Sequence, residues 1–167
     1  MLEKFVPDGI YDKFDDITPE YLSGIGIRAV ISDIDNTLAP YEVEEPTDRI
    51  ADWISSLLAA GIRVALISNN GAERVERFNR SLGLPAYPDA GKPKRKYILI
   101  AMKELGAAPE ETLVLGDQVF TDVFAGKRVG AKAFFVPPIR DKKTLFFRFK
   151  RFMERPFIKR YYKEAGK

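Results

Sequence analysis

The chain has 167 residues and a net charge of +3, and 46% of its residues are hydrophobic, which fits one globular domain with a proper core. It contains no cysteine and no histidine, which excludes disulfides, thiolate zinc sites, thiol nucleophiles and imidazole bases. Carboxylates and lysine must therefore do any acid–base work. No apolar run approaches the ~18 residues of a membrane span, and the start lacks the layout of a signal peptide, so we expect a cytoplasmic location.

The order of polar and apolar residues predicts strands and helices in alternation. Ile50, Ile54 and Leu57 recur at helical spacing, whereas residues 113–115 form a short continuous apolar run, as in a buried strand. This alternation predicts an α/β, Rossmann-like domain over residues 1–139, in three layers with a central parallel sheet covered on both faces. In chain order we expect a lead-in of helix or loop over 1–27, a strand over 28–34, a helix from Thr47 or Asp48 to Gly61, a strand over 63–67, a helix ending at Gly83, a short strand at 86–87, a helix over 95–105, a strand over 112–115, a helix over 121–129 and a last strand over 131–136.

Polar residues occur where the predicted strands end. Because the carboxyl ends of parallel strands meet at one edge of the sheet, we expect these separated residues to share one cleft. Two neighbouring acids are costly to keep ionised without a cation, and carboxylate oxygens are the hard ligands that Mg²⁺ prefers. The acids among these residues therefore predict a Mg²⁺ site. The residues expected to share the cleft are Asp33, Ser68, Lys92 and Asp117, and the acids of the expected Mg²⁺ site are Asp33, Asp35, Asp117 and Asp122.

Four short motifs follow one another along the chain. They are Asp33-Ile34-Asp35-Asn36-Thr37, then Ser68, then Lys92-Pro93, then Gly116-Asp117 with Asp122. Each motif alone is weak, but four in this order after apolar strands resemble the haloacid dehalogenase (HAD) phosphatase superfamily. With Phe5-Val6-Pro7 and residues 17–22, the whole chain is similar to the YqeG-type group of subfamily IIIA, a group similar to the mitochondrial phosphatidylglycerophosphate phosphatase. The resemblance implies a HAD core over about residues 29–136.

The resemblance also implies the catalytic residues. Asp33 would be the nucleophile that forms an aspartyl-phosphate, which splits the hydrolysis into two easier displacements. Asp35 would protonate the leaving alkoxide and later deprotonate water. Thr37 would hold the motif turn and orient Asp35. Lys92 would balance the charge on Asp33 and on the transferring group.

The resemblance further implies how phosphate and metal would bind. Ser68 would donate to a phosphoryl oxygen, together with backbone N–H groups around Asn69 at the start of the next helix. The metal would be Mg²⁺, held by hard oxygen ligands. The implied ligands are Asp33, Asp117, the backbone carbonyl of Asp35, and Asp122. Asp122 would either bind the metal through water or hold Lys92 instead.

Ordinary structural explanations exist for several of these residues. The Ser68-Asn69-Asn70 segment would also serve as a helix cap and turn. Asp122 would also cap the helix predicted over 121–129. Lys92 would also fit a solvated charge run, because three further cations follow it. They are Lys94, Arg95 and Lys96.

The C-terminal segment differs in charge from the rest. Residues 140–167 carry 11 Lys and Arg against 3 Asp and Glu, whereas residues 1–139 carry 16 against 21. We expect a basic amphipathic helical tail, broken at Pro156, whose aromatic residues and charges suit the surface of an anionic membrane through residues 140–163. Packing of the apolar stripe on the domain, and single-stranded nucleic acid as a less fitting partner, are the alternatives. The stripe is Leu145, Phe146, Phe149, Phe152 and Met153.

The motifs and the tail together predict a Mg²⁺-dependent phosphatase that dephosphorylates phosphatidylglycerophosphate at the inner face of the membrane. The segments between the motifs are too short for a cap domain, so the cleft is expected to be open to a lipid headgroup. Two alternatives stay open: a phosphatase of the same fold acting on a soluble metabolite or a nucleic-acid end, and a non-enzymatic phosphate-binding module. The acid at Asp35 argues against the module, and a homo-oligomer that encloses the cleft also stays open.

Overall fold

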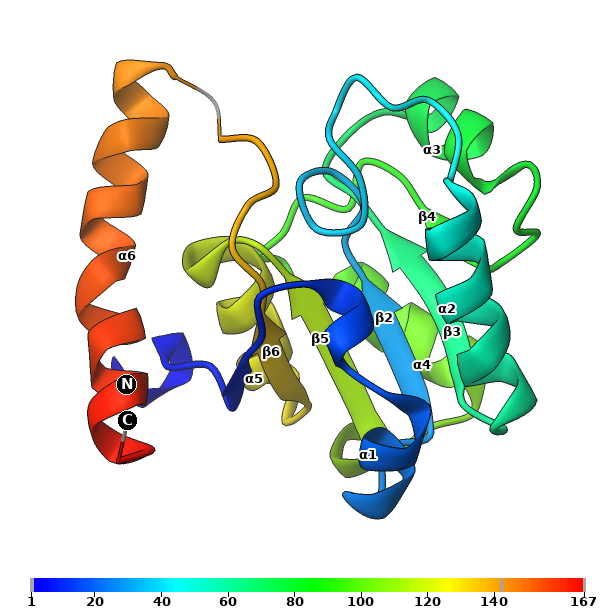
Figure 1. The fold of residues 1–167 in the computed structure, drawn as a ribbon, viewed down its shortest axis with the longest axis horizontal. Helices are drawn as coiled ribbons and strands as arrows, with labels where there is room; N and C mark the ends of the chain where they lie inside the picture. Colours follow the sequence, from blue (N-terminus) through cyan, green and yellow to red (C-terminus); the bar gives the residue numbers. More distant parts are fainter. Residues whose placement is uncertain (1, 142, 167) are drawn as a thin grey trace.

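The structure is a computed structural model that describes residues 2–141 and 143–166, and a parallel sheet runs through its centre (Figure 1). The strand order is β1-β6-β5-β2-β3-β4, with parallel pairing throughout. The strands are β1 (Gly9–Ile10), β2 (Ala29–Ser32), β3 (Arg63–Ile67), β4 (Ala86–Tyr87), β5 (Thr112–Gly116) and β6 (Lys132–Phe135). The α-helices are α1 (Pro19–Gly24), α2 (Asp48–Ala59), α3 (Ala72–Asn79), α4 (Lys96–Leu105), α5 (Phe124–Val129) and α6 (Leu145–Glu164). Shorter helical turns are η1 (Leu2–Phe5), η2 (Phe14–Asp16), η3 (Pro109–Glu111) and the π-helical η4 (Val119–Val123).

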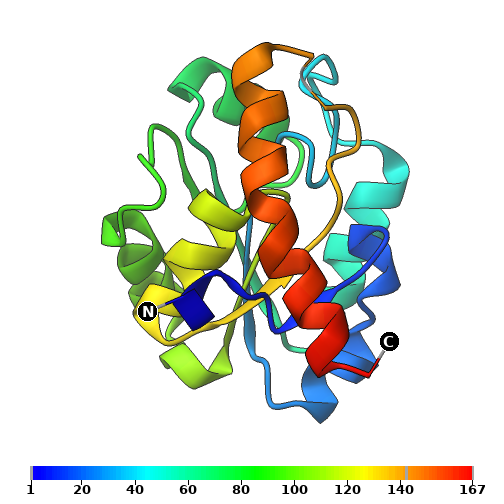
Figure 2. The same ribbon diagram turned by 90° about the vertical axis from the view of Figure 1, so that its left-hand side faces the viewer.

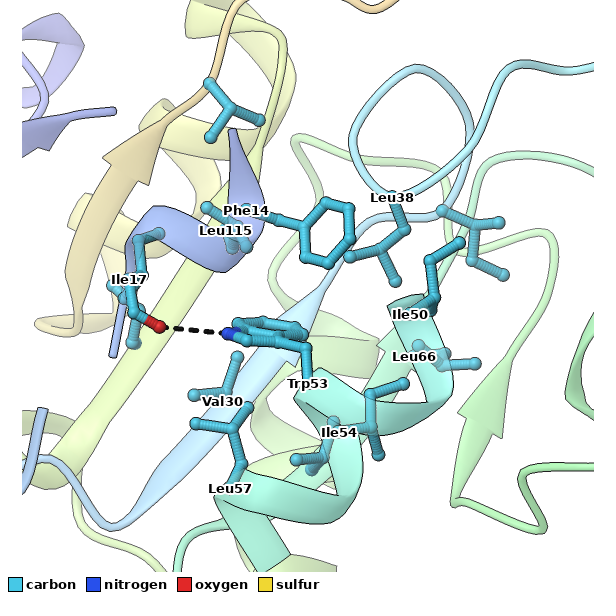
Figure 3. Packing of buried hydrophobic residues seen from close by; sticks show 14 of the residues in the cluster. Phe14, Ile17, Val30, Leu38, Ile50, Trp53, Ile54, Leu57, Leu66 and Leu115 are labelled. Carbon is cyan, nitrogen blue, oxygen red and sulfur yellow. Dashed lines mark hydrogen bonds between the residues drawn. The ribbon is translucent and has the colours of Figure 1, made fainter. Parts of the chain in front are cut away.

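Helices cover both faces of this sheet, because successive strand residues point to opposite sides. Val30 of β2 packs in the core under α1, α2 and α3, whereas its neighbour Ile31 packs under α4 and α5. On the first face Trp53 of α2 lies at the centre of the apolar cluster, and its indole N–H donates to the carbonyl oxygen of Ile17 at 2.9 Å (Figure 3). The predicted three-layer α/β architecture is confirmed.

Local signals in the sequence fix where α2 begins and ends. The Thr47 hydroxyl accepts a hydrogen bond from the backbone N–H of Ile50, which satisfies one of the free donors of the first turn. Gly61 follows the helix with a φ of +79°, a left-handed conformation that glycine adopts without strain. The predicted start at Thr47 or Asp48 and end near Gly61 are therefore confirmed.

Three predicted elements differ from the structure. The lead-in contains β1, which pairs with β6 at the edge of the sheet. One of its two residues is a glycine, which strands disfavour, and it precedes the alternating pattern from which the equally short β4 could be placed. The helix predicted over 121–129 begins earlier as η4, a π-helical turn, and continues as α5. The prediction that Pro156 breaks the tail helix was wrong, because α6 continues through it to Glu164. Proline removes one backbone donor, and the buried Glu154 beside it holds the helix to the domain.

The tail helix α6 lies along one side of the domain, next to η1 and η4 (Figure 2). Phe157 packs against Phe5 and Phe120, with ring centroids 5.2 and 5.9 Å away. The apolar stripe faces away from this contact, with exposed fractions from 82% at Leu145 to 44% at Met153, so its packing on the domain is excluded. Among the described residues, no helix combines the length and apolar character needed to cross a membrane.

Candidate active site

One pocket at the carboxyl edge of the sheet gathers the residues that follow the strands. Asp33 follows β2, Ser68 follows β3 and Asp117 follows β5, while Lys92 lies in the loop between β4 and α4. The pocket has a volume of about 220 Å³, and the predicted shared cleft is confirmed. It is lined by Asp33, Asp35, Asn36, Tyr41, Ser68, Asn69, Asn70, Lys92, Asp117, Gln118, Thr121, Phe147, Lys150 and Arg151.

Lys92 lies buried between two carboxylates. Its ammonium donates to Oδ1 of Asp33 at 2.8 Å and to Oδ1 of Asp122 at 2.7 Å. The three cations that follow it in the sequence are exposed, so Lys92 is not part of a solvated charge run. A buried ammonium is costly unless it is paired, and here two carboxylates provide the pairing.

Asp33 has both carboxylate oxygens engaged. Oδ1 accepts from Lys92, and Oδ2 accepts from the Thr37 hydroxyl at 3.0 Å. Burial raises the pKa of Asp33 to about 6; the nearby Lys92 lowers it and the Asp122 carboxylate raises it. Its position is fixed by the sheet, since its backbone N–H donates to the carbonyl oxygen of Leu115 on β5.

Asp117 follows β5 and is fully buried. Its Oδ2 accepts from the guanidinium of Arg151 at 2.6 Å, and the Thr37 hydroxyl lies 3.4 Å from its Oδ1. Burial raises the pKa of Asp117 to about 8, and the negative charges of Asp33 and Asp122 raise it further. The site therefore holds more negative charge than its cations balance.

Asp122 belongs to the turn η4 and holds the lysine. Its Oδ1 accepts from Lys92 at 2.7 Å, and its Oδ2 accepts from the backbone N–H of Gln118 at 3.1 Å. It comes this close to the strand because residue 116 is a glycine, where an added Cβ would overlap the Asp122 carboxyl group. This arrangement matches the implied role of holding Lys92.

The loop after β3 is held by its own side chains. The Ser68 hydroxyl accepts from the backbone N–H of Asn70 at 3.0 Å, as a turn would. The Asn69 side chain accepts from the backbone N–H of Lys92 at 2.7 Å and donates to the carbonyl oxygen of Lys92 at 3.2 Å. The Asn69 side chain thus fixes the Lys92 loop against the Ser68 loop.

Asp35 stands apart from the buried acids. Its carboxylate accepts from the guanidinium of Arg74 at 3.0 Å and from the side-chain amide of Asn70. Sequence analysis missed both partners, although Arg74 lies in the first turn of the helix that follows the Ser68 segment. The Asp35 side chain lines the pocket, where a ligand that enters from solvent can contact it.

The chain matches a family model over part of this region. The model describes the haloacid dehalogenase-like hydrolases, and it matches residues 38–130. The chain belongs to this family. A relative from Bacillus subtilis (strain 168), named probable phosphatase YqeG, is 35% identical over 159 residues, which is 95% of this chain and 92% of the relative. The phosphoglycolate phosphatase of Aquifex aeolicus is 26% identical over 156 residues, covering 78% of this chain and 72% of that protein.

Solved structures of other HAD-like hydrolases share the fold. The cobalt-bound deoxy-D-mannose-octulosonate 8-phosphate phosphatase of Haemophilus influenzae gives a TM-score of 0.55 at 22% identity, over 66% of this chain and 68% of that one. The phosphate complex of CbbY from Rhodobacter sphaeroides also gives 0.55, at 18% identity, over 72% of this chain and 90% of that one. At these identities the comparison concerns the arrangement of sheet and helices.

The acids of this HAD-like hydrolase fit a divalent cation. Asp33, Asp117 and Asp122 are buried, and each offers a carboxylate oxygen within 4.8 Å of the others. Hard oxygen donors in excess of the local positive charge are what Mg²⁺ requires. All three acids already accept hydrogen bonds from the protein, so a cation at this site would share their oxygens with those donors. Asp122 is the acid that also accepts from a backbone N–H, that of Gln118, which fits a role in holding Lys92.

The helix α6 supplies site residues that sequence analysis missed. Arg151 binds Asp117 and also donates to Glu154 at 2.9 Å, while Lys150 donates to the side-chain oxygen of Gln118. Glu154 is fully buried and accepts from the backbone N–H of Val119 at 2.9 Å. A second period in the tail, at positions 147, 150, 151, 154, 157 and 158, was the available signal, but it mixes charged with apolar residues and so does not resemble a buried face.

Proposed function

We propose that this HAD-like hydrolase is a Mg²⁺-dependent phosphomonoester phosphatase that works through an aspartyl-phosphate on Asp33. The observation that supports it most is the buried Lys92, 2.8 Å from Asp33 and 2.7 Å from Asp122. This ammonium orients the Asp33 carboxylate, whose other oxygen accepts from the weaker donor Thr37, and would balance charge that builds on the phosphoryl group. Phosphoryl transfer depends mainly on such positioning and charge balance.

The reaction would proceed in two displacements. A carboxylate oxygen of Asp33 attacks phosphorus, the bond to the leaving oxygen breaks, and the leaving alkoxide takes a proton from Asp35. Water then gives a proton to Asp35 and attacks the same phosphorus, which releases inorganic phosphate and restores Asp33. The Ser68 hydroxyl and the backbone N–H groups of the Asn69 turn would hold the phosphoryl oxygens.

The metal would be held by Asp33, Asp117 and the backbone carbonyl of Asp35. Bound Mg²⁺ supplies positive charge to the phosphoryl oxygens. Two features of the chain favour this position: the oxygens of the buried acids lie within 4.8 Å of one another, and their raised pKa values mark unbalanced negative charge.

For the substrate we propose phosphatidylglycerophosphate, which would be converted to phosphatidylglycerol. The resemblance of the YqeG group to the mitochondrial phosphatidylglycerophosphate phosphatase supports this choice. The absence of an inserted cap, as far as the described residues reach, leaves the pocket open to a headgroup. The exposed apolar stripe of α6, with the exposed Arg148 and Arg155 beside it, suits peripheral contact with an anionic bilayer.

The test is phosphate release from phosphatidylglycerophosphate in mixed micelles with Mg²⁺, beside p-nitrophenyl phosphate and a panel of sugar phosphates. We expect Asp33→Asn to lower turnover by roughly a thousandfold or more, because the nucleophile is lost while the amide keeps the shape of the side chain. A preference for the lipid supports the full proposal. Turnover of the small esters alone would retain the phosphatase and reject the lipid, and turnover unaffected by Asp33→Asn would reject the mechanism.

A further inference from the structure

The pocket has an inner part and an outer part that differ in chemistry. The inner part holds Asp33, Lys92 and Asp117, which would handle the transferring phosphoryl group. The outer part includes the half-buried Phe147 and Lys150, which form a wall from the first turns of α6. The α6 wall therefore lies where the alcohol that leaves the phosphate must extend towards solvent.

The two cations on the α6 wall are paired very differently. Arg151 makes ion pairs with Asp117 at 2.6 Å, with Glu154 at 2.9 Å and with Asp141 at 3.2 Å. Lys150 makes no ion pair among the residues that the structure describes; its hydrogen-bond partner there is the neutral amide oxygen of Gln118. The charge of Arg151 is thus neutralised by carboxylates of the protein, whereas the ammonium of Lys150 is free to form an ion pair with a ligand.

Lys150 is also partly removed from water. Its side chain is half-buried at the pocket rim, and burial lowers the pKa of its ammonium. The charges of Glu154, Asp122 and Asp117 offset part of this cost without touching the ammonium, and an anion in direct contact with it would offset more. Such a residue is better explained by a ligand than by folding.

The α6 wall is held rigidly from the next turn of the helix. Glu154 lies one turn beyond Lys150, is fully buried and accepts from the backbone N–H of Val119 at 2.9 Å. About one turn after Glu154, Phe157 packs on Phe5 and Phe120. When a charged side chain is already held in place, less conformational entropy is lost on binding of the ligand.

We propose that Lys150 forms a subsite for a second anionic group, carried by the leaving alcohol of the substrate. This inference rests on the proposed phosphatase function and specifies its substrate class: a phosphomonoester whose alcohol carries a phosphodiester or a second phosphate. Lys150 donates to that anion, with Gln118 as its second partner. The phosphodiester of a lipid headgroup and the second phosphate of a soluble bisphosphate share this chemistry.

The experiment compares substrates that share a glycerol leaving group but differ in its charge. They are glycerol 3-phosphate, glycerol 1,3-bisphosphate, and short-chain phosphatidylglycerophosphate kept below its micelle concentration so that no membrane contact contributes. For each, kcat/KM is measured with the wild type, Lys150→Gln, Lys150→Arg and the control Lys103→Gln, an exposed lysine of α4 away from the pocket.

We expect Lys150→Gln to lower the ratio of kcat/KM for the second-anion substrates to that for glycerol 3-phosphate by about tenfold, mainly through KM. Lys150→Arg should keep most of the ratio, and Lys103→Gln should leave it at the wild-type value. A fall confined to the phosphodiester substrate would identify the lipid headgroup as the source of the anion; a fall for both would identify second anions in general.

Two results would overturn the subsite in distinguishable ways. If the wild-type enzyme hydrolyses none of these esters or p-nitrophenyl phosphate, the phosphatase itself is rejected and the subsite with it. If the wild type is active and Lys150→Gln leaves the ratio of kcat/KM values unchanged, only the subsite is rejected. The same holds if this change lowers kcat/KM equally for all substrates.

Discussion

Lys92 is the side chain around which the other charged residues of the pocket are arranged. A single carboxylate would leave its buried ammonium poorly compensated, and Asp122 adds the second partner at 2.7 Å. Asp122 reaches it because Gly116 leaves room for the turn η4 to close against β5. The position of Lys92 thus depends on the absence of a side chain at residue 116 of β5.

Gly116→Ala tests this dependence. The added methyl group would overlap the Asp122 carboxyl group, so we expect Asp122 to move, Lys92 to lose one partner, and the free energy of unfolding to fall by ~1–3 kcal/mol. Phosphatase activity should fall with it. Gly24→Ala is the matched control, because nothing lies within 4 Å of a Cβ added there. Normal stability and activity of Gly116→Ala, measured by urea unfolding and ester hydrolysis, would contradict the proposed arrangement.

Mg²⁺ should stabilise the protein more at high pH than at low pH. The pKa of Asp117 is about 8 in the fold against 3.8 for an ordinary aspartate, so without metal the unfolded chain releases this proton first. The free energy of unfolding of the metal-free protein therefore falls as pH rises from about 4 to about 8. A bound cation removes that loss, because it replaces the proton.

The measurement is the gain in Tm on adding Mg²⁺ to protein treated with a chelator, at pH about 8 and about 5. We expect the larger gain at the higher pH, and Asp117→Asn should abolish most of the difference. Equal gains at both pH values would show that the buried acids do not hold the ion.

At the scale of elements, the strands and α6 differ in how far the sequence predicts them. Asp33, Ser68 and Asp117 could be placed at one edge because each follows an apolar run that has only one way to be buried. The helix α6 has two candidate faces. Its apolar stripe is exposed, and its inner face is chosen by partners that lie far away in the sequence, such as the backbone N–H of Val119 for Glu154. The repeat that includes Lys150 and Arg151 mixes charged with apolar residues, so it did not identify them as pocket residues.

Glu154→Ala should loosen α6 from the domain. It removes the acceptor of the Val119 N–H and a partner of Arg151, and leaves both groups poorly compensated, so we expect a loss of ~2–4 kcal/mol in the free energy of unfolding. Urea unfolding measures this loss. Glu164→Ala removes an exposed partner of Arg160 on the same helix and should leave stability at the wild-type value. Equal effects of the two changes would mean that Glu154 does not anchor the helix.

The apolar stripe should bind anionic vesicles. Paired substitutions Phe149→Asp and Phe152→Asp, both at exposed positions, should weaken sedimentation with vesicles of phosphatidylglycerol, because they remove apolar contact and add charge repelled by the lipid. Leu99→Asp, an exposed change on α4, is the control. If wild type and paired variant sediment equally, or if neutral phosphatidylcholine vesicles bind as well, the membrane proposal is wrong.

At the scale of the whole molecule, the C-terminal helix α6 lines one part of the pocket, and the described residues contain no inserted cap domain. Figure 2 shows α6 running along the side of the domain beside the N-terminal segment. The division between a domain over 1–139 and a tail over 140–167 stays a prediction. Residues from both segments line the same pocket. The change in composition near residue 140 is therefore a change in net charge, and residues on both sides of it contribute to the candidate site.

The position of α6 also has a consequence for how the protein is made. Ribosomes release a chain from its N-terminus, and domains generally begin to fold in that order. Strands β2, β3 and β5 precede α6 in the chain, so we expect the nascent sheet to gather Asp33, Asp117 and Asp122 before Arg151 docks on Asp117. During that interval a proton or a metal ion would neutralise Asp117, so the order of synthesis makes the closing of the sheet sensitive to pH and to divalent cations.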